Sequence, residues 1–312
     1  MQTDNKLILG VTASGKGSVG FALAQRLGAE ILSVDSMKIY KRMDIGTAKP
    51  SRERRAAVPC HAIDIVEPYD TYNVGLYYEY AYKAIHDIQA RQKPVVAIGG
   101  TALYIKALLY GLFDGPGADQ AVRSELLRRS ESEGTAALHK QLALIDPDAA
   151  QRISPNDERR IVRALEVWQM TGKPISSFQT QFDVPKPRHG WCVIGLRREK
   201  AMESQRINAR VKKMVDSGLV QEVRGLLSED RPLSPQAAVA IGYAEIIDHL
   251  QGKYTLEEAV ERIKINTRRL AKSQRTWFKT FRQVQWIDIN QSDTVETTLS
   301  RAIDIIEQYE NQ

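Results

Sequence analysis

Short apolar runs alternate with amphipathic stretches along the first third of the chain. Four runs are short, apolar and bounded by turn residues, which predicts buried strands at 6–12, 29–35, 61–66 and 94–99. Between them, 19–27 and 75–91 have helical spacing. This alternation is typical of an α/β fold, in which helices cover both faces of a parallel sheet. The runs 191–196 and 284–289 predict two later strands of the same sheet.

The pattern changes between 116 and 187, where no β-rich run occurs and helical spacing covers 121–129, 135–144 and 156–170. Ser154 and Pro155 predict the start of the third helix, and Gly172 and Pro174 predict its end. The stretch 179–189 is typical of an exposed linker, and helices are expected again over 205–227 and 256–281. We therefore expect a core made of 1–115 and 187–312, with 116–186 as an inserted helical domain.

Composition narrows the class of protein. Of the 312 residues, 43% are hydrophobic and 26% charged, which favours a folded globular chain over a disordered one. No run approaches the ~18 apolar residues of a membrane helix, and the first residues lack the pattern of a signal peptide. Cys60 and Cys192 cannot form a disulfide framework, so we expect a reducing, cytoplasmic setting. The net charge of +6 is a mild indication of a polyanionic partner.

A glycine-rich segment, Gly10-Val-Thr-Ala-Ser-Gly-Lys-Gly17, follows the first predicted strand and begins a predicted helix. Backbone N–H groups in such a loop point at phosphate, and Lys16 adds a mobile positive charge. An ordinary glycine-rich turn is the alternative. The usual phosphate-binding loop ends in Ser or Thr, whose hydroxyl ligates Mg²⁺, but Gly17 stands at that position.

Two further segments end strands at the same edge of the sheet. Asp35 follows the second strand and is a candidate proton acceptor or metal ligand, although an aspartate here is equally typical of a helix cap. Gly99 and Gly100 let backbone approach a ligand, and Thr101 adds a hydroxyl. A tight strand–helix turn is the alternative for this second segment.

Cations form two clusters. Arg159 and Arg163 lie one helical turn apart, an arrangement that suits phosphates or bases but also a solvated face. The region 262–282 favours nucleic-acid binding, because its eight cations meet almost no acidic residues; they are Arg262, Lys264, Arg268, Arg269, Lys272, Arg275, Lys279 and Arg282. Histidines and cysteines are scattered, and they predict neither a zinc site nor a catalytic thiol.

Taken together, several long blocks identify a family. The chain resembles the bacterial tRNA dimethylallyltransferases in the order and content of GVTASGK, VDSMKIYKRMDIGTAKP, VPCHAIDIVEP, GGTALYIKALL, SPNDERRIVRALEV, TGKP, NARVKKMVDSGLVQEV, AIGYAEI and TRRLAKSQRTWF. The resemblance implies a P-loop NTPase-like core and a helical insertion that contacts tRNA. It also implies transfer of a dimethylallyl group from dimethylallyl diphosphate to N6 of the adenosine 3′-adjacent to the anticodon (position 37), in tRNAs reading codons that begin with U. A monomer that uses Mg²⁺ and binds the anticodon stem-loop is expected.

The resemblance also implies roles for residues. Asp35 matches the base that takes the N6 proton, Thr101 matches a residue contacting the target nucleotide, and Arg210 matches an arginine that neutralises the leaving diphosphate. The loop that holds the diphosphate consists of Gly10, Val11, Thr12, Ala13, Ser14, Gly15, Lys16 and Gly17. The positions matching tRNA contacts are Asp35, Ser36, Met37, Lys38, Thr101, Arg123, Arg159, Arg160, Ile161, Val162 and Arg163. Metal ligands are not assigned.

Four positions depart from the family pattern: Gly17, Met37 with Lys38, Cys60 and Ala102. They leave room for a catalytically weakened tRNA-binding paralogue. An adenylate isopentenyltransferase acting on free nucleotides is a second alternative, which the helical insertion and the basic region disfavour. A small-molecule kinase is a third, disfavoured because the matching blocks extend far beyond the loop.

Overall fold

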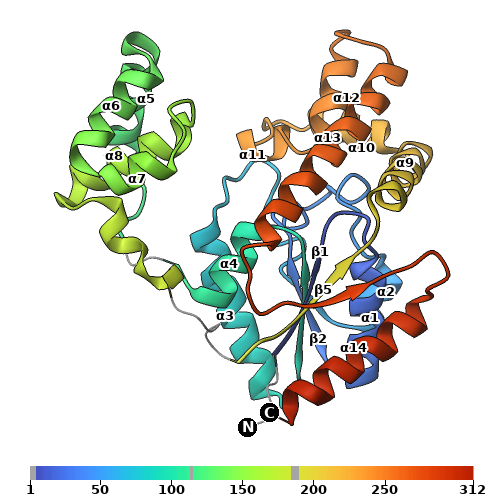
Figure 1. The fold of residues 1–312 in the computed structure, drawn as a ribbon. Coiled ribbons are helices and arrows are strands. Elements are labelled where there is room, and N and C mark those ends of the chain that lie inside the picture. The colour runs from blue at the N-terminus through green and yellow to red at the C-terminus, as the bar shows by residue number, and fades with distance from the viewer. Residues whose placement is uncertain (1–4, 113–114, 184–189, 312) are drawn as a thin grey trace. The chain divides into compact units, whose positions relative to one another are not determined.

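A six-stranded parallel sheet forms the centre of the larger of two compact units (Figure 1). The computed structural model describes residues 5–112, 115–183 and 190–311. The larger unit comprises Met1–Leu109 and Pro187–Gln312, and the smaller unit comprises Tyr110–Lys186. The strand order is β3-β2-β4-β1-β5-β6, with β1 Asn5–Gly10, β2 Glu30–Val34, β3 Cys60–His61, β4 Val95–Gly99, β5 Cys192–Arg197 and β6 Gln285–Asp288. The predicted parallel α/β fold is confirmed.

The central strand β1 is buried along its whole length because it pairs with β4 on one side and β5 on the other. Its Leu7 lies opposite Ala97 and Val193, and all three side chains are buried. A continuous apolar run is what a strand covered on both faces requires. The loop that follows β1 therefore begins in the interior of the sheet, between β4 and β5.

The third strand is much shorter than the predicted 61–66. β3 ends at His61, because Ala62 and Asp64 adopt positive φ angles of 58° and 56° and leave the extended conformation. The carboxylate of Asp64 instead binds the side chains of Lys49 and Arg55. The prediction of a strand beyond His61 was wrong, since these ion pairs hold the segment in a loop.

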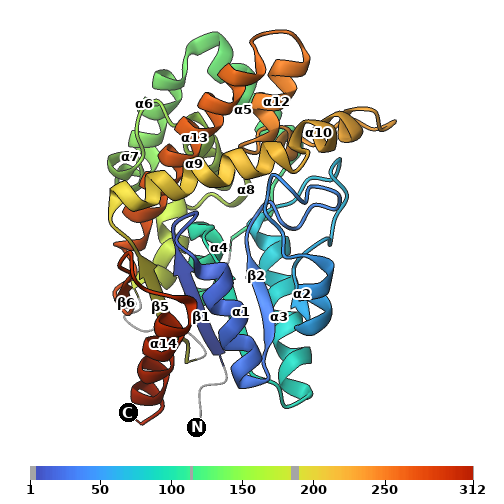
Figure 2. The same cartoon turned by 90° about the vertical axis from the view of Figure 1, so that its right-hand side faces the viewer.

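The helices of the larger unit are α1 Lys16–Leu27, α2 Arg52–Ala57, α3 Val74–Ala90, α4 Ala102–Tyr110, α9 Lys200–Asp216, α10 Leu219–Leu227, α11 Pro235–Ala238, α12 Tyr243–Leu250, α13 Leu256–Phe278 and α14 Val295–Glu310. Helices α1 and α14 lie on one face of the sheet and α3 and α4 on the other (Figure 2). The single helix expected over 205–227 is two helices, because Gly218 adopts a φ of 98° between α9 and α10. Helices α9 and α13 lie beside the carboxyl end of the sheet (Figure 2). No helix within the described ranges is both long and apolar enough to cross a membrane.

The smaller unit is helical in its described residues. It contains α5 Gln120–Glu133, α6 Thr135–Ile145, α7 Pro147–Arg152, α8 Glu158–Thr171 and the 3₁₀ segment η1 Ile175–Asp183. Leu126, Leu138 and Leu165 are buried in its core. Asp157, not Ser154, caps α8, since its Oδ1 accepts a hydrogen bond from the Arg160 N–H at 3.2 Å. Part of the expected linker, 179–183, is η1, and 184–189 lie outside the described residues.

Candidate phosphate and nucleotide site

The larger unit contains a cavity of about 900 Å³ at the carboxyl ends of β1, β2 and β4. Its lining comes from the loop after β1, the turn after β2, the loop after β4 and helices α9 and α13. Asp35 is the one carboxylate among the described lining residues, whereas the lining cations are Lys16, Lys38, Lys49, Arg54, Arg206, Arg210 and Lys213. This balance favours a polyanionic ligand.

The loop after β1 has the geometry of an anion-binding turn. Ala13 and Gly15 adopt positive φ angles of 62° and 101°, and Ser14 is fully buried beneath them. In the described part of the chain, the N–H groups of Ala13, Gly15 and Gly17 donate to no protein acceptor. Three free amides at the start of α1 are therefore available to a phosphate.

Two arginines that the sequence analysis missed donate hydrogen bonds to backbone carbonyls of this loop. Arg206 donates from Nε to the Ala13 carbonyl at 2.8 Å, and Arg198 does the same to Ser14 at 2.9 Å. These two hydrogen bonds hold the backbone of the loop in place at Ala13 and Ser14. No motif reveals these contacts, since they link positions far apart in the sequence.

Asp35 and Thr101 lie together at the edge of the sheet. Asp35 Oδ1 accepts hydrogen bonds from the backbone N–H groups of Met37 at 2.9 Å and Lys38 at 3.3 Å. Thr101 Oγ1 accepts one from the Ser36 N–H at 3.1 Å. Asp35 therefore both stabilises the turn and lines the cavity, so its capping and ligand-facing roles occur together.

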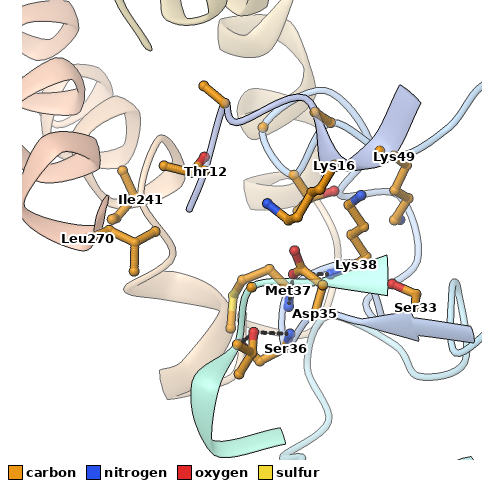
Figure 3. A pocket seen from close by; sticks show the side chains of 18 of the residues that line it. Thr12, Lys16, Ser33, Asp35, Ser36, Met37, Lys38, Lys49, Ile241 and Leu270 are labelled. Carbon is orange, nitrogen blue, oxygen red and sulfur yellow. Dashed lines mark hydrogen bonds between the residues drawn. The ribbon is translucent and has the colours of Figure 1, made fainter. Parts of the chain in front are cut away.

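Lys16 and Arg210 are two half-buried cations of the cavity lining. Burial lowers the pKa of Lys16 to about 7, with the charges of Arg210 and Lys38 acting in the same direction and Asp35 opposing them. Burial also lowers the pKa of Arg210, against the attraction of Asp35. Lys16 Nζ donates to the Val11 carbonyl at 3.1 Å. Figure 3 shows the Lys16 and Lys38 amino groups in the same part of the cavity as the Asp35 carboxylate.

Another part of the cavity wall is apolar. Ile241 and Leu270 line it, together with Leu103, Val239 and Trp277. Figure 3 shows Ile241 and Leu270 on the far side of the cavity from Lys38 and Lys49. One cavity thus combines a phosphate-binding end with a hydrophobic wall, as a ligand with a charged head and a hydrocarbon tail requires.

No cluster of three or more His, Cys, Asp or Glu suited to a metal occurs within the described ranges. At Gly17, a side chain would be unobstructed, since an added Cβ meets no heavy atom within 4 Å. A divalent ion here would therefore depend on ligand oxygens and water. This donor set fits Mg²⁺, which commonly binds through one or two carboxylates and substrate phosphates.

The basic residues predicted in the smaller unit have mixed roles. Arg123 and Arg163 each donate to the same oxygen of Glu166 at 2.8 Å, and Glu166 is fully buried. These two arginines therefore stabilise the helical unit. Arg159 and Arg160 are exposed, with Arg160 paired to the carboxylate of Asp157, which caps the same helix.

Two hydrophobic residues between these arginines do not fit the expected direct contact with RNA. Ile161 and Val162 are 0% and 3% exposed in the core of the smaller unit. This burial contradicts a contact through their side chains. The helical pattern accounts for it, because both residues lie on the apolar face of α8.

The basic region 262–282 has more acidic neighbours than expected. Lys264 pairs with Glu261 and Arg275 pairs with Glu203. Arg268 and Arg269 instead bind neutral side-chain oxygens, so their charges remain uncompensated by these contacts. Arg268 and Arg269 are therefore among the cations of the region that remain suited to a polyanion.

Comparisons of the sequence with known proteins identify its family. The profile of the family described as IPP transferase matches residues 38–281, and that of isopentenyl transferase matches 3–58. A tRNA dimethylallyltransferase of Geobacter metallireducens is 45% identical over 282 residues, covering 90% of this chain and 91% of that protein. A protein named tRNA dimethylallyltransferase 2 from Geotalea uraniireducens is 43% identical over 286 residues, with 92% of each chain covered.

Solved structures are similar over nearly the whole chain. The full-length tRNA isopentenylpyrophosphate transferase of Bacillus halodurans is 35% identical with a TM-score of 0.69, covering 99% of this chain and 98% of that one. A eukaryotic dimethylallyltransferase acting on tRNA is 26% identical with a TM-score of 0.80, covering 97% of this chain and 79% of that one.

Proposed function

This chain belongs to the IPP transferase family, and we propose on that basis that it is a tRNA dimethylallyltransferase. The reaction moves a dimethylallyl group from dimethylallyl diphosphate to N6 of the adenosine at position 37, next to the anticodon, in tRNAs reading codons that begin with U. The observation that carries the proposal is the cavity that joins a phosphate-binding loop, Asp35 and an apolar wall. The apolar wall suits the hydrocarbon tail of a prenyl donor.

The diphosphate is the leaving group and needs cations around it. Lys16, Arg210 and the free amides of Ala13, Gly15 and Gly17 are arranged to bind it. The bond between the allylic carbon and the diphosphate oxygen breaks while a bond from that carbon to N6 forms. Negative charge develops on the diphosphate as the bond breaks, so cations that are already in place stabilise the transition state.

The amine that attacks must lose a proton to remain neutral as a product. Asp35 is proposed to accept the N6 proton, because it is the carboxylate of the described lining. Its Oδ1 is held by two backbone N–H groups, which orients the carboxylate before the acceptor binds. Thr101 lies beside it, bonded to Ser36, and is proposed to contact the target nucleotide.

A divalent cation, which we propose to be Mg²⁺, would supply further neutralisation of the diphosphate when it is bound. Diphosphate oxygens and water would supply its ligands, since Asp35, the carboxylate of the described lining, is assigned to the N6 proton. Gly17 contributes no hydroxyl to the cation.

The acceptor is proposed to be the anticodon stem-loop of tRNA. Its target base must leave the stack to enter a cavity of this kind. We propose that the turn residues 35–37, the exposed Arg159 and Arg160, and the uncompensated Arg268 and Arg269 contact the RNA. We propose that residues 1–115 and 187–312 form the catalytic core and that 116–186 is an inserted domain that binds tRNA. The protein is proposed to act as a monomer in the cytoplasm.

The test is to incubate the purified protein with dimethylallyl diphosphate, Mg²⁺ and unmodified tRNA, and to analyse the digested RNA by mass spectrometry. We expect N6-(dimethylallyl)adenosine from tRNA that carries A37, and none from the same tRNA with G37. Adenosine monophosphate serves as a parallel acceptor. Product from the nucleotide but not from tRNA would overturn the proposal in favour of an adenylate isopentenyltransferase.

A further inference from the structure

Lys38 places a cation in the cavity that has no hydrogen-bond or ion-pair partner for its Nζ among the described residues. Its backbone N–H is held by Asp35 Oδ1, so the turn does not depend on the side chain. The neighbouring Lys49 differs in this respect, because its Nζ lies 2.7 Å from Asp44 and 2.5 Å from Asp64. The charge of Lys49 is therefore compensated by two carboxylates, whereas the charge of Lys38 is available to a ligand.

The surroundings of Lys38 disfavour the charged form of its amino group. Burial lowers its pKa, Asp35 opposes this shift, and the charge of Arg210 adds to it. Lys16 lies close enough for its own pKa to be lowered by Lys38. Three cations therefore share one carboxylate, and a bound polyanion would relieve their mutual repulsion.

Lys38 supplies a positive charge near Gly17, the position that lacks a hydroxyl for a metal ion. Gly17 lies in the first turn of α1, beside the phosphate-binding loop, and offers no oxygen for a metal. Lys38 rises from the turn after β2 toward the same part of the cavity as Lys16 (Figure 3). An ammonium group there can neutralise part of the charge that a hydroxyl-anchored divalent ion would otherwise neutralise.

We propose that the Lys38 Nζ binds the diphosphate of the prenyl donor directly, as a third cation beside Lys16 and Arg210, and that it reduces the dependence of this site on a divalent metal. The identity of the ligand rests on the proposed function. The alternative role for Lys38, a contact with the RNA, is an outcome of the test.

The test is calorimetric titration with inorganic diphosphate in EDTA, repeated at saturating Mg²⁺. We expect Lys38→Gln to weaken binding in EDTA by roughly ten- to hundred-fold, as for the loss of one charge-assisted hydrogen bond, and by less with Mg²⁺. Lys38→Arg should retain most of the affinity. Lys212→Gln is the matched control, because Lys212 is exposed on α9 and does not line the cavity.

Titration of the same proteins with tRNA separates the two roles. Weaker tRNA binding by Lys38→Gln, with unchanged diphosphate affinity in EDTA, would show that Lys38 reads RNA and would overturn the proposal. Failure of the wild-type protein to bind diphosphate in EDTA would also overturn it. Prenylation of tRNA is assayed independently, so loss of the proposed function and loss of the Lys38 contact give different results. Thermal midpoints show whether each variant is folded.

Discussion

The side-chain amide of Gln274 accepts a hydrogen bond from the Thr12 N–H at 2.8 Å, although 262 residues separate the two positions. The same amide donates from Nε2 to the Gly100 carbonyl at 2.8 Å. Gln274 is 8% exposed on α13, and it thereby fixes the distance between the loop after β1 and the loop after β4. Because one loop is proposed to hold the donor and the other the acceptor, we infer that Gln274 is a positioning residue.

Replacing Gln274 should change donor use more than it changes folding. In Gln274→Leu, the Thr12 N–H and the Gly100 carbonyl lose their partner, at a cost of about 1–3 kcal/mol for each group left unsatisfied. Gln274→Glu still accepts from Thr12 but cannot donate to Gly100, and it brings a negative charge to the diphosphate. We expect KM for the donor to rise by about tenfold in the Leu variant and by more in the Glu variant. If both variants lose thermal stability equally and keep the wild-type KM, Gln274 is only structural.

Asp35→Asn should separate catalysis from binding. Asparagine retains the oxygen that accepts from Met37 and Lys38, so the turn should persist while the proton acceptor is lost. We expect single-turnover rates to fall by about 10²–10⁴-fold, the usual contribution of a general base, with tRNA affinity nearly unchanged. Wild-type turnover in this variant would remove Asp35 from the mechanism.

Donor affinity should fall as pH rises above 7. The pKa of Lys16 is lowered from 10.5 to about 7 by burial and by neighbouring cations, so the free protein carries a charged Lys16 below that pH and a neutral one above it. A bound diphosphate favours the charged form, so binding at pH 8 should take up a proton. Calorimetry in two buffers of different ionisation enthalpy measures this uptake. Lys16→Arg stays charged and should bind without it; equal uptake in both proteins would show that another group titrates.

Binding of tRNA should depend steeply on salt through Arg268 and Arg269. Each phosphate contact contributes roughly 0.7–0.9 to the slope of log affinity against log salt concentration. We therefore expect the double alanine variant to reduce that slope by about 1–2. Lys264→Ala is the control, because Lys264 already lies 2.6 Å from Glu261 and should leave the slope nearly unchanged. A double variant with the wild-type slope would place these arginines away from the RNA.

The sequence predicted those features that depend on residues close together in the chain. Apolar runs located β1, β2 and β4, and Gly10–Gly17 located the loop, because strand burial and glycine conformation leave marks within a few residues. The third strand was predicted too long, since Lys49 and Arg55 hold Asp64 through ion pairs that no apolar pattern reveals. Arg198, Arg206 and Gln274 were missed for a similar reason: each contacts the loop only after the chain has folded.

In the helical unit, part of the stretch that matches tRNA contacts is occupied by the protein's own packing and ion pairs. Ile161 and Val162 belong to a stretch expected to contact tRNA, yet the helical period directs both into the core. Arg123 and Arg163 look like free cations in sequence, but both bind the buried Glu166. A cluster of arginines in a sequence therefore indicates an anionic partner, which can be a carboxylate of the same chain as well as an external phosphate.

Gly17→Thr should raise activity where Mg²⁺ is scarce. A side chain at this position meets no heavy atom within 4 Å, so threonine can be accommodated without displacing the loop. Its hydroxyl would add one ligand for Mg²⁺, which water would otherwise have to supply. We expect the apparent Mg²⁺ affinity to increase, with little change in turnover once Mg²⁺ is saturating.

Gly17→Val is the matched control for this change, since valine has the shape of threonine without the hydroxyl and shares its effect on the helix. The measurement is a Mg²⁺ titration of prenylation for the three proteins with tRNA as acceptor. Coincident curves for the Thr and Val variants would show that the hydroxyl is irrelevant in this cavity. Product from Gly17→Thr with none from the wild-type protein at any Mg²⁺ concentration would instead identify the chain as a catalytically silent tRNA-binding paralogue, because the cations and Asp35 alone would then be insufficient for transfer.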